Sequence, residues 1–155
     1  LSINASYEPT GSATNSATGF GVTYTGIEGL SVSYASGDDS TVAAADATVL
    51  KGSYAYGPVT VAYSDYEYDT AATTNDDDMT AYKVTYTVSD ELSIAYASED
   101  IDTGTKSADY NEVSVAYTTG GMTISASMGE ANNRDGTTTA TMDNERWALG
   151  ASFAF

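Results

Sequence analysis

The chain has 155 residues, of which 22 are acidic and 5 are basic, so its formal charge is −17, and it contains neither Cys nor His. This length is that of one domain, and the missing residue types exclude disulfides, thiol nucleophiles, Cys-type zinc sites and His-based triads. The negative charge disfavours nucleic acid as a partner, because phosphate backbones would be repelled. With 41% hydrophobic residues and 13 tyrosines, the chain is too apolar for a disordered acidic tail.

Ten segments alternate apolar and polar residues along the whole chain, and none shows the 3.6-residue period of a helix. Alternation with a period of two predicts β-strands that have one apolar face. In chain order the segments lie at about 1–8, 17–26, 30–37, 47–56, 58–68, 79–88, 92–100, 109–118, 122–130 and 144–155. We therefore expect one all-β domain over residues 1–155.

The two faces of these predicted strands differ in chemistry. One face takes the large apolar residues, from Leu1 and Ile3 at the start to Phe153 at the end, and is expected to carry no charge. Successive side chains point to opposite faces, so the other face takes the intervening Ser, Thr, Ala and Gly residues. It also takes four charged residues, Lys51, Lys83, Glu112 and Arg146.

The connections between the strands alternate in length. Short turns are predicted at 27–29, 57–58, 89–91 and 119–121, and long polar loops at 9–16, 37–46, 69–78, 101–108 and 131–143. Strict alternation of short and long connections predicts an antiparallel up-and-down meander with one tight rim and one elaborate rim. No linker and no second domain are indicated.

Acidic residues gather in the predicted long loops. The candidates for attracting cations are Asp38, Asp39, Asp76, Asp77, Asp78, Asp100 and Asp102. Calcium prefers such oxygen ligands, but the spacing is not that of a defined loop such as the EF-hand. Diffuse attraction of cations is therefore expected, with loop-bound calcium as the alternative and no other cofactor. The same clustering in loops, rather than in a pocket, argues against catalysis by paired carboxylates.

The tyrosines occupy matching strand ends. Tyr34, Tyr63 and Tyr96 lie next to the long loops, whereas Tyr54 and Tyr86 lie next to the short turns. Two aromatic belts about 25 Å apart, flanking an aliphatic band, are typical of a transmembrane β-barrel. A soluble sandwich or lipocalin-like barrel would also alternate, but its solvent face would carry more Lys and Glu. The membrane barrel is favoured, and a soluble acidic all-β protein remains the alternative.

The last strand supports a family resemblance. Its sequence from Trp147 to Phe155, which is apolar at every second position, is similar to the terminal strand of Gram-negative outer-membrane proteins, in which the final Phe belongs to the assembly signal. The turn style of Tyr24-Thr25-Gly26 and Tyr86-Thr87-Val88 resembles that of general diffusion porins of alphaproteobacteria, marine ones especially. The assembly-signal candidates are Trp147, Phe153 and Phe155.

The resemblance implies a location and partners. It implies the bacterial outer membrane, contact with lipid and lipopolysaccharide, a homotrimer, and the barrel-assembly machinery during biogenesis. It implies a water-filled channel for passive diffusion of small hydrophilic solutes and ions, without enzymatic activity. The small residues of the inward face cannot fill a narrow barrel. We therefore expect the chain to be the C-terminal portion of a barrel of about sixteen strands, rather than a complete ten-stranded one.

The four inward charges are the candidate pore-lining residues. Lys51, Lys83, Glu112 and Arg146 lie on the predicted fourth, sixth, eighth and tenth strands, near the long-loop rim. A mainly basic row on a channel wall would bias ion passage. The competing hypothesis is that each charge anchors an acidic loop, and the two hypotheses are compatible. An alternative function is a structural or adhesive outer-membrane barrel whose acidic loops form the working surface.

Overall fold

The computed structural model describes residues 1–9, 16–38, 45–70, 76–104, 106–133 and 143–154. It contains ten strands, all antiparallel to their neighbours. They are β1 (Ser2–Glu8), β2 (Ala17–Tyr24), β3 (Leu30–Asp38), β4 (Asp46–Tyr56), β5 (Val59–Asp69), β6 (Asp77–Thr87), β7 (Leu92–Thr103), β8 (Lys106–Thr119), β9 (Met122–Asn132) and β10 (Asn144–Phe153). The predicted all-β, up-and-down architecture is confirmed.

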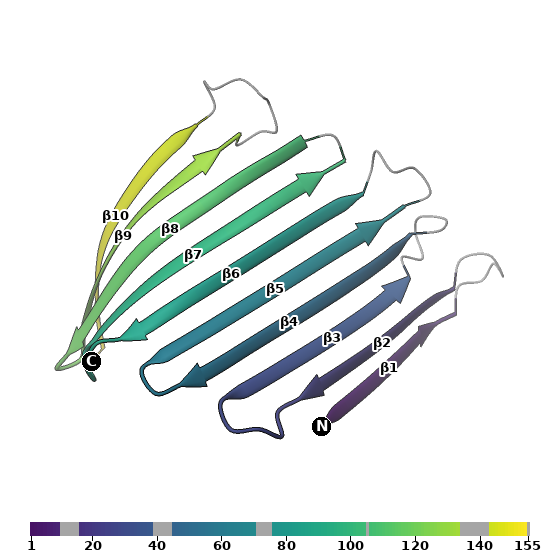
Figure 1. The fold of residues 1–155 in the computed structure, drawn as a ribbon, viewed down its shortest axis with the longest axis horizontal. Coiled ribbons are helices and arrows are strands. Elements are labelled where there is room, and N and C mark those ends of the chain that lie inside the picture. The colour runs from purple at the N-terminus through teal and green to yellow at the C-terminus, as the bar shows by residue number, and fades with distance from the viewer. Residues whose placement is uncertain (10–15, 39–44, 71–75, 105, 134–142, 155) are drawn as a thin grey trace.

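The strands form one sheet in sequence order, β1 to β10 (Figure 1). The chain enters β1 and leaves β10 at the same rim, which also holds the short turns. The sheet is open, because β1 and β10 form its two edges and do not pair with each other. No helix in the described part of the chain is long and apolar enough to cross a membrane.

Glycines make the tight turns of the short-turn rim. Gly120 and Gly121 have φ angles of 54° and 81° and join β8 to β9 as a two-residue hairpin. In the type I′ form of such a hairpin both central residues have positive φ, because that twist matches the twist of the flanking strands. Gly57, with φ of 55°, serves the same rim between β4 and β5. These turns set the register of the strand pairs that follow.

The sheet separates two kinds of surface instead of enclosing a core. Among the described residues, only the small side chain of Ala45 is buried, with 2% exposed. The apolar face carries large exposed side chains such as Val61 (44%), Ile94 (41%) and Leu149 (71%). The opposite face, called here the small-residue face, carries Ser, Thr, Ala and Gly between a few charges. This arrangement confirms the predicted alternation.

Four predicted loops are shorter than expected, because strands extend into 37–46, 69–78, 101–108 and 131–143. Residues 101–108 were predicted to form a long loop, but β7 continues to Thr103 and β8 already begins at Lys106, and these two residues pair. Gly104, with φ of 60°, lies in the turn between them. Asp77 and Asp78 likewise belong to β6, where they pair with Tyr68 and Glu67. These polar residues have the amino-acid composition of turns. They belong to strands because they form cross-strand hydrogen bonds.

The prediction that the apolar face carries no charge is wrong near the long-loop rim. Beyond the aromatic residues, the same side-chain phase continues into carboxylates. These are Asp38, Asp46, Asp65, Glu67, Asp69, Asp78, Asp100, Asp102, Asp109, Glu130 and Glu145. Some of these carboxylates, such as Asp65 and Glu130, already lie within the predicted strand ranges, and the longer strands of the structure add others, such as Asp46 and Asp102.

The predicted spacing of the tyrosine belts also needs correction. Tyr63 of the upper belt is opposite Tyr82, which lies on the same face of β6 as Tyr86 and four residues from it. At ~3.3 Å per residue this is ~13 Å along the strand. The expected separation of the belts was about 25 Å. The apolar band is therefore narrow at β6, because above Tyr82 the same face carries Thr80 and then Asp78.

Candidate functional site

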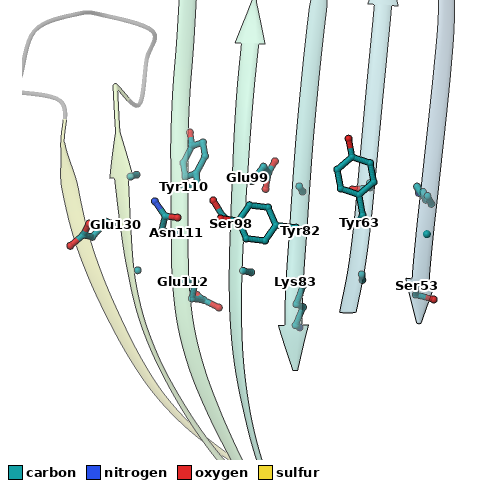
Figure 2. Close-up of a pocket in the computed structure, with 18 of the residues that line it drawn as sticks. Ser53, Tyr63, Tyr82, Lys83, Ser98, Glu99, Tyr110, Asn111, Glu112 and Glu130 are labelled. Carbon is teal, nitrogen blue, oxygen red and sulfur yellow. The ribbon is translucent and has the colours of Figure 1, made fainter. Parts of the chain in front are cut away.

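The small-residue face is hollowed. A cavity of about 800 Å³ lies along it and is lined by residues of β3 to β10 (Figure 2). Serine, alanine and glycine supply much of the lining, and they leave the backbone close to the open space. All four candidate residues from the sequence analysis line this cavity: Lys51, Lys83, Glu112 and Arg146. The structure therefore brings together four side chains that span 96 positions of sequence.

Three of the four charged residues share one row of the sheet. Lys83 is opposite Ala97, Ala97 is opposite Glu112, Glu112 is opposite Gly129, and Gly129 is opposite Arg146. Neighbouring strands are ~4.8 Å apart, so each charged residue lies ~10 Å from the next along the row. The row thus presents a positive, a negative and a positive charge with small residues between them.

Lys51 belongs to the next row toward the long-loop rim. This row runs through Ser64, Ala81 and Glu99 to Tyr110. Figure 2 shows Glu99 on β7 and Tyr110 on β8 in this part of the cavity. The offset between the two rows is two residues, ~7 Å along the strands. The candidate residues therefore form two adjacent rows instead of one.

Sequence reasoning missed Glu99 as a lining residue. Glu99 and Asp100 both lie within β7, on opposite faces of the sheet. Glu99 follows Ser93, Ala95 and Ala97 at every second position, and this alternation could have assigned it to the small-residue face. With Glu99 included, the wall carries three basic and two acidic side chains near its middle. A mainly basic wall is therefore too simple a description.

The charged side chains of the two rows are unpaired within the described residues. None of Lys51, Lys83, Glu99, Glu112 and Arg146 forms an ion pair or hydrogen bond to another described residue. Glycine is required at position 129, between Glu112 and Arg146, because a Cβ there would lie only 2.9 Å from the Asn111 carbonyl oxygen. The hypothesis that these charges anchor acidic loops stays a prediction, since residues 39–44, 71–75 and 134–142 lie outside the described part.

The acidic candidates for cation binding are spread over both faces. Asp38, Asp78, Asp100 and Asp102 belong to the phase of the apolar face, and Asp77 belongs to the small-residue face. Asp76 accepts a 2.8 Å hydrogen bond from the Thr70 backbone N–H, and Asp39 lies outside the described residues. No group of three or more potential metal ligands occurs among the described residues. Diffuse cation attraction stays a prediction.

Carboxylates face each other directly across many strand pairs above the apolar band. The register places Asp38 opposite Asp46, Glu67 opposite Asp78, Asp78 opposite Asp102, Asp100 opposite Asp109, and Glu130 opposite Glu145. Like charges in such positions are destabilising. At the ends of β3 and β4, the hydrogen bond with Asp38 raises the pKa of Asp46, and a hydrogen bond from Thr18 lowers the pKa of Asp38.

The candidate assembly residues lie on the edge strand β10. Trp147 and Phe153 project from the apolar face with 78% and 60% of their surface exposed. Phe155 lies outside the described residues. The large exposed area of these rings fits a strand with an apolar outer surface, while their role as an assembly signal stays a prediction.

The chain was compared with known families and proteins. A sequence profile described as Gram-negative porin matches residues 1–118. The match includes β1 to β7 and nearly all of β8. No curated protein matches the chain.

Proposed function

Because the chain belongs to the Gram-negative porin family, we propose that it forms the wall of a water-filled channel in the bacterial outer membrane. Small hydrophilic solutes and ions diffuse passively through this channel. The proposal involves no chemical transformation of the solute and no cofactor. The apolar face contacts lipid and the small-residue face contacts the water of the pore.

One observation carries the proposal: the two faces of a single sheet have opposite solvent preferences. Large apolar side chains are exposed on one face from Ile3 (64%) to Phe153 (60%). In water, so much exposed apolar surface would favour association, whereas lipid is a suitable solvent for it. The other face carries small polar residues and the charges Lys51, Lys83 and Arg146, which pair with no described residue and require water.

The open sheet supports a barrel that is wider than these ten strands. In lipid every backbone N–H and C=O must be satisfied, so exposed sheet edges do not occur in the hydrocarbon region. The outer edges of β1 and β10 therefore pair with further strands in the assembled barrel. The small side chains Ser33, Ala97 and Ser125 leave the interior unfilled, as a wide channel requires. A barrel of about sixteen strands fits both features.

The test is reconstitution of the protein in liposomes and planar bilayers. We expect step increases in conductance and swelling of liposomes in isosmotic arabinose, since both report a water-filled path. Empty liposomes, and liposomes with heat-denatured protein, are the controls. Correctly folded, membrane-inserted protein that gives neither conductance nor swelling would contradict the proposal. Such a result would favour a structural or adhesive barrel whose acidic residues above the apolar band form the working surface.

A further inference from the structure

The small-residue face has an apolar strip next to its charged rows. Val49 is opposite Tyr66, Tyr66 is opposite Met79, and Met79 is opposite Ile101. All four side chains are half-buried and lie on the same face as Lys51 and Glu99. We call these four residues the apolar strip. It is a continuous apolar row on a face that otherwise carries mainly small residues, the charged side chains and Tyr110.

The apolar strip and the charged residues are adjacent in register. Val49 is two residues from Lys51 on β4, and Ile101 is two residues from Glu99 on β7. Two residues of strand correspond to ~7 Å, and the lysine and glutamate side chains cover part of this distance. A solute bound by a charge of the upper row can therefore contact the apolar strip with its own side chain.

The charges themselves alternate in sign. Along the lower row Lys83, Glu112 and Arg146 follow one another at ~10 Å intervals, and Figure 2 shows the Glu112 side chain extending toward β7, on the side of Lys83. An ion of a single charge is attracted by one of these groups and repelled by the next. A solute that carries both charges interacts favourably with two neighbouring groups at once.

From these two features we propose, resting on the channel function above, that the preferred solutes are zwitterions with an apolar side chain, which is the chemistry of aliphatic amino acids and short apolar peptides. The solute carboxylate interacts with Lys83 and the ammonium group with Glu99, which is opposite Ala81, two residues from Lys83, on the neighbouring strand. The apolar side chain contacts the apolar strip. Binding of this kind raises the solute concentration at the wall and increases its flux at low concentration.

The experiment compares solute fluxes through the reconstituted protein in liposome swelling. Leucine and asparagine are zwitterions of nearly equal size, and arabinose is a neutral reference for the open channel. We expect a higher leucine-to-asparagine ratio in the unaltered protein than in the double variant Met79→Ser with Ile101→Ser. The ratio is expected to fall about fourfold, which is the factor for losing roughly one methylene of apolar contact. Ala95→Ser, on the same face but near the short-turn rim, is the matched control and should leave the ratio unchanged.

The charge requirement has its own variant. Lys83→Gln combined with Glu99→Gln removes one positive and one negative charge, so the net charge of the wall is unchanged. We expect both amino acids to lose flux relative to arabinose, with the leucine-to-asparagine ratio nearly preserved. If arabinose passes all variants equally, and neither the leucine-to-asparagine ratio nor the amino-acid flux relative to arabinose changes in any of them, the inference is wrong. The proposed channel function is then unaffected. If arabinose does not pass the unaltered protein, the channel function itself fails.

Discussion

The Tyr63 hydroxyl donates a 2.8 Å hydrogen bond to the carboxylate of Asp65, the next residue on the same face of β5. Asp65 also accepts a 3.1 Å hydrogen bond from the Thr80 hydroxyl of β6. The phenol ring therefore lies against the apolar band while its polar end reaches the first carboxylate above it. Tyr96 makes a similar contact, donating a 2.8 Å hydrogen bond to the Asn111 side chain. These contacts mark the upper boundary of the apolar face.

The first prediction concerns this boundary. Replacing Tyr63 by Phe keeps the ring but leaves the Asp65 carboxylate with one hydrogen bond fewer. We expect a small decrease in the free energy of unfolding, because a charged acceptor loses one donor. Urea unfolding in lipid vesicles measures it. Tyr56→Phe is the control, because the Tyr56 hydroxyl bonds no described residue; an equal loss in both variants would contradict the assigned role.

The second prediction concerns which face contacts lipid. Val61→Arg and Val115→Arg place a charge on the apolar face, at positions that are 44% and 38% exposed. We expect each to destabilise the folded state by about 2–4 kcal/mol, the cost of Arg near the bilayer midplane. Ser33→Arg and Ser125→Arg, on the small-residue face, should cost less in the same vesicle titration. If the serine variants were the more costly pair, the assignment of the two faces would be inverted.

The third prediction concerns pH and the facing carboxylates Asp38 and Asp46, at the long-loop ends of β3 and β4. The hydrogen bond with Asp38 raises the pKa of Asp46 above its ordinary value of 3.8, so the ionised form of Asp46 is unfavourable in the folded state. That penalty is present above the raised pKa and disappears as the pH falls below 3.8. Asp46→Asn should therefore stabilise the protein at pH 7.

The same variant should give no gain at pH 3, where the Asp46 carboxyl is already protonated. The pKa of Asp38 is lowered by the hydroxyl of Thr18, which lies 2.5 Å away. Its stabilising contribution is present above pH 3.8 and is lost as the pH falls through the lowered value. Thr18→Val should accordingly destabilise the protein at pH 7 and not at pH 2. Unfolding midpoints at the three pH values test both signs, and a pH-independent effect of Asp46→Asn would refute the account.

The fourth prediction concerns ion selectivity. Replacing Lys51, Lys83 and Arg146 together by Gln should shift the reversal potential toward cations, because a charged wall biases passage. The shift should persist at ~1 M salt, where the Debye length is ~3 Å and the acidic residues at the mouth are screened. Glu99→Gln should shift the reversal potential in the opposite direction. An unchanged potential in the triple variant would mean that the basic residues have a structural role alone.

Much of this architecture could be predicted from the sequence because a strand has an exact side-chain period. Apolar residues at every second position, as in Val59, Val61 and Tyr63, assign a face without knowledge of any neighbouring strand. Ten such segments with alternating short and long connections are enough to predict an up-and-down sheet. The same parity placed Lys51, Lys83, Glu112 and Arg146 on one face.

The tertiary structure decided where strands end and which residues stand side by side. Asp77, Asp102 and Lys106 have the composition of loops, yet hydrogen bonds to a neighbouring strand hold them in the sheet, and no property of a single segment reports such pairing. Register likewise depends on turn geometry, such as the positive φ angles of Gly120 and Gly121. The register places Lys83 and Glu112 in one row, and it brings Val49 and Ile101 into another row through Tyr66 and Met79. The reason is that contacts between strands depend on strand pairing and not on distance along the chain.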